Sequence, residues 1–201
     1  ALKSIAENYA NKGNHIITSA VEHHAILHTC QYLEKKGIRV TYLPVDKDGQ
    51  VSVESLREAI DDQTILVSIM MANNEIGTIN PIAELGAVCK EKGVLFHVDA
   101  VQAVGTLPID VKAMNIDMLS MSAHKFYGPK GVGALYVRKG IRLKPFMHGG
   151  AQENKHRAGT ENVPGIVGMG KAIELAEAER EANAQRLQAM RDRLIAGIEE
   201  K

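Results

Sequence analysis

Apolar stretches of seven to nine residues recur along the chain, and segments with helical spacing separate them. We predict strands at 15–21, 39–45, 64–72, 94–100, 117–124 and 133–140. The stretch 64–72 is apolar on both faces, which is typical of a central parallel strand. Because strands alternate with helices, the pattern predicts an α/β, doubly wound sheet.

The helical segments carry recognisable start and stop signals. We predict helices near 1–13, 23–36, 53–60 and 81–93, then from 163 to the end of the chain. Ser52 is a candidate cap, and Pro81 and Gly93 frame another helix. The segment 163–178 is small and apolar, so it can pack closely. The charged segment 179–201 has apolar residues at spacings of three and four, which indicates a one-faced surface helix.

Composition and charge exclude several classes of protein. The chain is 45% hydrophobic and 24% charged, a globular balance. Lys+Arg and Asp+Glu are both 24, so the basic surplus of a nucleic-acid binder is missing. No apolar run approaches the ~20 residues that cross a bilayer, and the first residues resemble a helix rather than a signal peptide. With two cysteines and no disulfide framework, we expect a cytoplasmic location.

The glycine-rich turn at 122–133 carries the most specific pattern for chemistry. A predicted strand runs into Ser122, His124 and Lys125. A lysine at a strand end is expected to be partly desolvated, which lowers the pKa of its ammonium group from about 10.4. The neutral amine can condense with a carbonyl, and Ser122 and His124 can bind an anion beside it. The simpler alternative is a solvated lysine on a basic turn, and the pattern is not that of a P-loop.

Asp99 ends an otherwise apolar predicted strand, at the position where open α/β sheets bind ligands. A buried carboxylate is costly without a cation, and a protonated pyridine nitrogen would be a suitable partner. Gln102, one short turn later, could reach the phenolic oxygen of the same ring. The structural alternative is that Asp99 only caps the following helix.

Histidines follow the first predicted strand, at positions 23, 24 and 28. An imidazole at this point can stack on a planar ring and transfer a proton near neutral pH. His24 and His28 share a helical face, so metal binding is an alternative, although no cysteine or carboxylate completes a ligand set. These histidines can also be ordinary surface residues.

Two polar loops complete the candidate chemistry. Asn73 and Asn74 follow the strand at 64–72, where an amide can bind a cofactor oxygen or a substrate carboxylate, or form an Asx turn. The loop 149–162, with Thr160, can bind a ligand or be simply solvated. Because four of the polar clusters follow strands in the same orientation, we expect them to meet at one edge of the sheet.

In five segments the chain resembles the cysteine desulfurases of the class V aminotransferase group: VEHHAIL, NNEIG, FHVDAVQ, SAHKFYGPKG and RAGTEN. Pro129 to Gly131 and the RAGTEN loop are more similar to the nitrogen-fixation and iron–sulfur-cluster branch than to the selenocysteine-lyase branch. The resemblance implies the cofactor pyridoxal 5'-phosphate (PLP). It also implies the aspartate-aminotransferase type of fold: three layers around a mostly parallel, seven-stranded-type sheet.

The resemblance also implies roles for individual residues. Lys125 would attach the cofactor covalently, His23 would stack on the pyridine ring, and Asp99 would pair with its nitrogen. Ser122 and His124 would bind the phosphate.

Three further residues are implied by the same resemblance. Asn74 and Gln102 would lie near the phenolic oxygen, and Thr160 would reach the phosphate in a neighbouring subunit, so the protein is expected to be a homodimer. The reaction would remove sulfur from L-cysteine, giving L-alanine and an enzyme persulfide. An iron–sulfur scaffold or another acceptor would take the sulfur.

A full family member begins before Ala1 with a turn that cradles the phosphate, and it continues beyond Lys201 with the nucleophilic cysteine and a substrate-binding arginine. Cys30 and Cys89 do not match that nucleophile. We therefore expect a truncated large domain at 1–160, a helical connection at 161–201, and no activity of the chain alone. The rivals are a selenocysteine lyase or another class V aminotransferase, and a non-catalytic sulfur-transfer interaction module.

Overall fold

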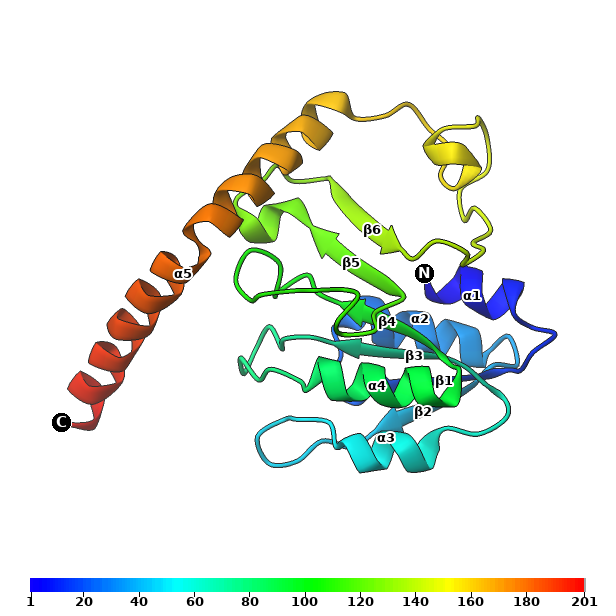
Figure 1. Cartoon of the computed structure of the whole chain (residues 1–201), viewed down its shortest axis with the longest axis horizontal. Helices are drawn as coiled ribbons and strands as arrows, with labels where there is room; N and C mark the ends of the chain where they lie inside the picture. Colours follow the sequence, from blue (N-terminus) through cyan, green and yellow to red (C-terminus); the bar gives the residue numbers. More distant parts are fainter. Residues whose placement is uncertain (201) are drawn as a thin grey trace.

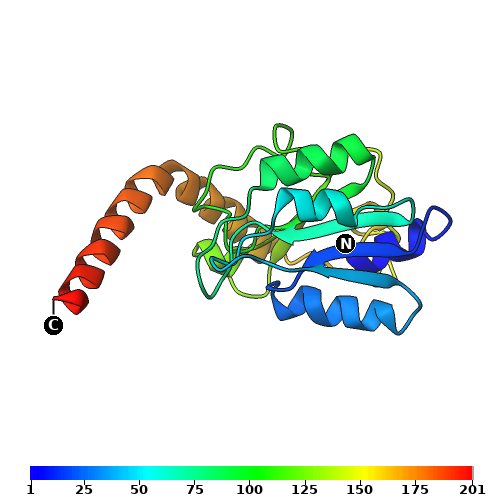
Figure 2. The same cartoon turned by 90° about the horizontal axis from the view of Figure 1, so that it is seen from below.

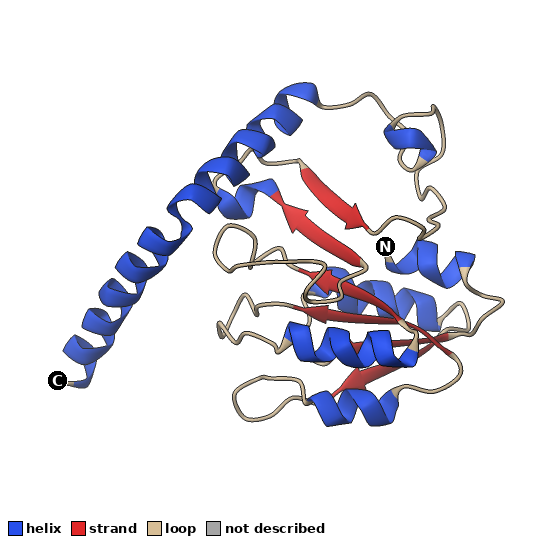
Figure 3. Cartoon of the chain, in the orientation of Figure 1, coloured by secondary structure: helices blue, strands red, loops and turns tan. Residues whose placement is uncertain are grey.

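The computed structural model describes residues 1–200, which form one mostly parallel sheet between helices (Figure 3). The strands are β1 (His15–Ser19), β2 (Arg39–Leu43), β3 (Thr64–Met70), β4 (Leu95–Asp99), β5 (Met118–Ser122) and β6 (Gly133–Val137). Their order is β2-β1-β3-β4-β5-β6, and only β6 runs antiparallel within these residues. All the predicted strands are confirmed. The seven-stranded expectation is corrected to six strands in the described residues.

Helices cover both faces of the sheet (Figures 1 and 2). They are α1 (Leu2–Asn8), α2 (His24–Glu34), α3 (Val53–Ala59), α4 (Ile82–Lys92) and α5 (Val163–Glu199). α3 and α4 lie on one face, and α1 and α2 lie on the other, as both views show. Each face has its own buried cluster: Leu56, Leu85 and Phe96 belong to one, and Ile5 and Ile16 to the other. The predicted three-layer α/β architecture is therefore confirmed.

Local sequence signals set the ends of these helices. The Ser52 hydroxyl accepts a hydrogen bond from the Ser55 N–H at 3.3 Å, as a cap should. Gly93 ends α4 in the left-handed conformation, with φ of 69°, which a glycine adopts without a steric penalty. α4 delivers the chain into β4, the central strand that ends in Asp99.

Two buried histidines bridge neighbouring strands. His97 on β4 contacts the Ser68 hydroxyl on β3 and the Ser120 hydroxyl on β5, both at 2.8 Å. His15 on β1 makes the same kind of bridge to Thr41 and Thr64, again at 2.8 Å. Because buried polar groups are costly unless they are hydrogen-bonded, these bridges favour one alignment of the strands. The strand ends are thereby held in a defined register.

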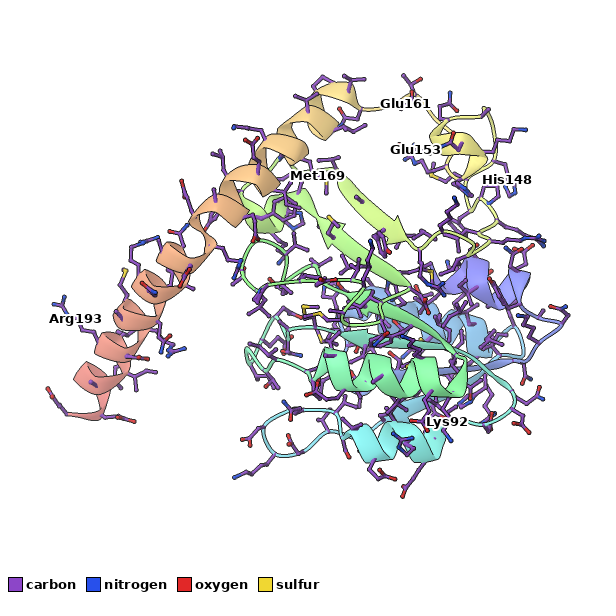
Figure 4. All side chains as sticks on the ribbon, viewed as in Figure 1. Lys92, His148, Glu153, Glu161, Met169 and Arg193 are labelled. Carbon is purple, nitrogen blue, oxygen red and sulfur yellow. The ribbon has the colours of Figure 1, made fainter. Side chains whose placement is uncertain are left out.

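α5 is one continuous helix of 37 residues and spans both of the segments predicted from the sequence. Its first half passes over the sheet, where Met169 is buried, and its second half projects away from the body, as the position of Arg193 shows (Figure 4). The large apolar residues of the second half, Leu187, Met190, Leu194 and Ile198, are exposed. Among residues 1–200, no helix is both long and apolar enough to cross a membrane.

Candidate functional site

The candidate site lies where four parallel strands end, on the left of the sheet in Figure 1. The strand register places Met70, Asp99 and Ser120 side by side, at or near the carboxyl ends of β3, β4 and β5. β1 ends at Ser19 and leads through a short loop into α2. The chain segments that carry the predicted residues therefore start from adjacent strand ends, apart from the loop that contains Thr160.

Asp99 is the last residue of β4 and is 9% exposed. Its Oδ1 accepts a hydrogen bond from the Val101 N–H at 3.0 Å. Burial raises the pKa of this carboxyl group, while the Val101 N–H and the charge of His23 act in the opposite direction. Within residues 1–200, Asp99 takes part in no salt bridge. It is thus a buried carboxyl group that forms no ion pair within the described residues.

His23 is the N-cap of α2, and its Nδ1 accepts a hydrogen bond from the Ala25 N–H at 3.1 Å. The ring is exposed, and it lies close enough to Asp99 for its charge to lower the pKa of that carboxyl group. His24 and His28 stack on each other with centroids 5.0 Å apart. No group of three or more potential ligands forms in the described part of the chain, so the metal alternative gains no support.

Lys125 lies in a 3-10 turn, η1 (Ala123–Phe126), directly after β5. The side chain is exposed, so the expected partial desolvation is wrong for this structure. The physical reason is that the strand ends at Ser122, and the turn carries the lysine out of the sheet. Ser122 Oγ and His124 Nδ1 lie 2.8 Å apart, so the two predicted anion ligands contact each other.

The turn after Lys125 leaves no room for a side chain at Gly128. A Cβ atom at that position would lie 2.9 Å from both the Cβ and the carbonyl oxygen of Ala123. The preceding residue, Tyr127, adopts a φ of 65°, which is rare for a residue other than glycine. The tight path that the glycines predicted after Lys125 is confirmed.

The two asparagines after β3 differ in their contacts, and only Asn73 forms the Asx turn that the sequence suggested. The Asn73 side chain forms an Asx turn by accepting the N–H groups of Glu75 and Ile76, at 2.8 and 3.0 Å. It also donates to the Val21 carbonyl at 3.0 Å, which joins this loop to the loop before His23. Asn74 is exposed beside the turn, and Gln102 is half-buried three residues beyond Asp99.

Thr160 belongs to the loop between β6 and α5, and it is exposed. Its neighbour Glu161 lies just before α5, and His148 and Glu153 lie further back along the same loop, away from the ends of the parallel strands (Figure 4). The structure therefore does not bring this loop to the site within one chain. A role for Thr160 in a neighbouring subunit stays a prediction.

Sequence reasoning missed Glu22, the residue before His23. Its side chain is 4% exposed, and its Oε1 accepts hydrogen bonds from the Ser19 hydroxyl at 2.7 Å and the Met70 N–H at 2.8 Å. Burial raises the pKa of this carboxyl group to about 7, and the negative charge of Asp99 contributes in the same direction. The available signal was an acidic residue at a strand end, directly beside the candidate histidine.

Neither cysteine has the properties of a nucleophile. Cys30 is 0% exposed and Cys89 is 1% exposed. Burial, aided by nearby carboxylates, raises the pKa of both thiols to about 12. Because the thiolate is the reactive form, the burial and raised pKa of both thiols argue against a nucleophilic role for either.

Comparison with known proteins links this geometry to one family. Residues 1–201 match the family described as Aminotransferase class-V. The chain is 64% identical over 198 residues to a protein named cysteine desulfurase IscS from Methanosarcina thermophila, which covers 98% of this chain and 49% of that protein. The chain therefore spans about half the length of this curated relative.

Solved structures agree with the sequence comparison. A structure titled NifS-like protein is 46% identical with a TM-score of 0.96, and the match covers 99% of this chain and 55% of the other. A structure titled SspA in complex with cysteine is 47% identical with a TM-score of 0.83, covering 86% of this chain and 50% of the other.

Proposed function

Because the chain belongs to the class V aminotransferase family, whose members depend on PLP, we propose that it carries the cofactor site of a cysteine desulfurase. The proposed reaction removes sulfur from L-cysteine and yields L-alanine and a persulfide. The sulfur would then pass to an iron–sulfur scaffold or another acceptor. Relatives named cysteine desulfurase, and a similar structure titled as a complex with cysteine, support this assignment.

The observation that carries the proposal is the buried, unpaired carboxyl group of Asp99. It lies at the carboxyl end of a central strand and forms no ion pair among residues 1–200. The residues present fit PLP, since a protonated pyridine nitrogen would supply a cation for the Asp99 carboxyl group. When bound, PLP would accept the electron pair released at the substrate Cα.

The chain's own residues would hold the ring and move protons. Lys125 Nζ would attach the cofactor and later take the α-proton of the substrate, and its exposure leaves it accessible for both tasks. Asp99 would keep the pyridine nitrogen protonated. His23 would stack on the ring and exchange protons through its imidazole. Its location beside Asp99 supports that role.

The remaining residues would fix the cofactor's polar groups. Ser122 and His124, already in contact, would bind the phosphate, and Asn74 and Gln102 would lie near the phenolic oxygen. Thr160 would complete the phosphate site of a second subunit, so we propose a homodimer.

The sulfur-accepting thiolate is proposed to come from a segment of the protein other than these 201 residues. Cys30 and Cys89 are both buried and carry raised pKa values, which removes them as candidates. We accordingly propose that these residues alone do not complete sulfur transfer. We also propose that residues 1–160 belong to the cofactor-binding domain and 161–201 to a helical connection, in a cytoplasmic protein.

The test is a spectroscopic titration of the protein with PLP. A new absorbance band should appear on addition of PLP and should be lost in Lys125→Ala. Lys130→Ala is the matched control, because Lys130 is an exposed lysine in the same glycine-rich turn, and it should retain the band. Identical spectra for wild type and Lys125→Ala would refute the assignment of the lysine.

A further inference from the structure

Glu22 is a buried carboxyl group to which the proposed reaction assigns no role. Its Oε1 accepts two hydrogen bonds, from the Ser19 hydroxyl on β1 and from the Met70 N–H on β3. Its Oε2 is buried and has no hydrogen-bond partner among residues 1–200. The side chain therefore joins the two strand ends through one oxygen and leaves the other oxygen unpartnered.

Burial and the negative charge of Asp99 favour the uncharged form of Glu22, and they outweigh the opposite effect of the hydrogen bonds from Ser19 and Met70. Two titratable groups interact electrostatically with Glu22: Asp99 on β4 and the Cys30 thiol on α2. Neither supplies a positive charge. The adjacent His23 ring is exposed and interacts with Asp99. Within the described residues Glu22 forms no salt bridge. A buried carboxylate with one bare oxygen is far costlier than the corresponding acid.

We propose that Glu22 is a positioning residue of this site: a neutral carboxylic acid that joins the His23 loop to the end of β3 and leaves the site's negative charge on Asp99 alone. The importance of that charge rests on the proposed function, because Asp99 is the partner of the pyridine nitrogen there. The neutral state of Glu22 follows from its burial, its unpartnered Oε2 and the lack of an ion-pair partner among residues 1–200, independently of the proposed function.

Protonation of Glu22 makes the stability of the folded protein depend on pH. Burial raises the pKa of Glu22 from its ordinary 4.5 to about 7. The folded protein then binds the proton more tightly than the unfolded chain, so this group's contribution is complete below 4.5 and is lost as the pH rises to about 7. Glu22→Gln cannot ionise and keeps an oxygen for both hydrogen bonds.

The first experiment compares melting temperatures from pH 5 to pH 8.5 for wild type and Glu22→Gln, without PLP. The difference in melting temperature should be smallest at pH 5, should grow in favour of the variant as the pH rises to about 7, and should level off above that pH. Infrared spectra at pH 5.5 should show a protonated-carboxyl stretch that is missing in Glu22→Gln. Glu58→Gln, which replaces an exposed glutamate on α3, should change neither. If the melting temperatures of wild type and Glu22→Gln depend on pH in the same way, or if their infrared spectra are identical, Glu22 is not a neutral acid.

A second experiment tests positioning. Glu22→Ala removes the link between the loops and should raise the Kd for PLP by about ten-fold or more, whereas Glu22→Gln should stay within about two-fold of wild type. Equal Kd values for all three proteins would overturn the positioning role. If wild type forms no band with PLP, the proposed function fails, while the melting and infrared results still decide the state of Glu22.

Discussion

Asp99 accepts a hydrogen bond from the Val101 N–H in the turn after β4, and its carboxyl group forms no ion pair among residues 1–200. The sequence offered capping of a following helix as the alternative to pairing with a ring nitrogen, but the described residues form turns and no helix between β4 and β5. Pairing of this buried carboxyl group with the pyridine nitrogen stays a proposal. A substitution that keeps the hydrogen bond from Val101 and removes the ability to ionise therefore separates the structural role from the proposed pairing.

Asp99→Asn is such a substitution. Its amide oxygen can still accept the Val101 N–H, so the melting temperature should change little. The Kd for PLP should rise by about 10- to 100-fold, because an ion pair of about 1.4 to 3 kcal/mol is lost. An absorbance titration measures this. A Kd equal to that of wild type would contradict pairing with the pyridine nitrogen.

His97 gives a second prediction at the residue scale. Burial lowers its pKa from 6.5 to about 3, so its contribution to stability is complete above 6.5 and is lost as the pH falls through about 3. We expect urea unfolding at pH 7, 6, 5 and 4 to show this loss. As the pH falls, the free energy of unfolding of wild type should decrease by up to about 1.4 kcal/mol per pH unit relative to that of His97→Gln.

The matched control for His97 is His28→Gln, because His28 is exposed on α2, and this variant should follow the pH dependence of wild type. The comparison must be made against the variants, since Glu22 changes stability in the opposite direction between 4.5 and about 7. If the free energy of unfolding changes with pH equally in wild type and His97→Gln, the His97 ring does not titrate as a buried neutral group.

At the scale of elements, the sequence predicted which segments are strands and where polar clusters follow them. Periodicity and capping residues are local properties, so β3, α4 and the Ser52 cap could be inferred without the fold. Glu22 could not, because its burial depends on Met70, 48 residues away, and on the neighbouring β4. The exposure of Lys125 was missed for the same reason: the 3-10 turn ends the strand earlier than the apolar pattern suggested.

The contact between α5 and the turn after Lys125 depends on one glycine. A Cβ atom at Gly168 would lie 2.7 Å from Pro129 Cγ and 3.2 Å from Cδ, whereas a Cβ at Gly170 meets nothing within 4 Å. Both glycines lie in the same helix, two residues apart. Replacing either glycine by alanine should therefore change helix propensity by the same amount, but only the substitution at Gly168 should also disturb packing.

Gly170→Ala should stabilise the protein by up to about 1 kcal/mol, because alanine favours the helix. Gly168→Ala should lose that gain and destabilise the protein relative to Gly170→Ala by about 1 to 3 kcal/mol through overpacking. Thermal or urea unfolding measures both. Equal stability of the two variants would mean that Pro129 moves aside freely.

At the scale of the whole molecule, the chain has a packed body and one helix that leaves it. The strand ends of the body carry the candidate residues, and α5 passes over the sheet before it projects away (Figures 1 and 2). The exposed Leu187, Leu194 and Ile198 show that its second half has no packing partner among the described residues. The sequence predicted this one-faced pattern, but it could not show that both segments form one helix.

Hydrogen exchange should distinguish the two halves of α5. Because most helical stability in proteins comes from tertiary packing, amides in the projecting half should exchange faster than those of the packed half near Met169. α4 (Ile82–Lys92), which is packed on the sheet, is the internal reference. Exchange as slow in the projecting half as in α4 would contradict the absence of a partner there.

A helix of 37 residues is about 55 Å long. It contacts the turn after Lys125 where Gly168 lies against Pro129, so we expect a reorientation of that turn to tilt the helix. Over the projecting half of about 25 Å, a tilt of about 10° displaces the far end by about 4 Å. A small rearrangement of the turn after Lys125 would therefore move the carboxyl end of α5 by a larger distance, which a distance probe at that end can record.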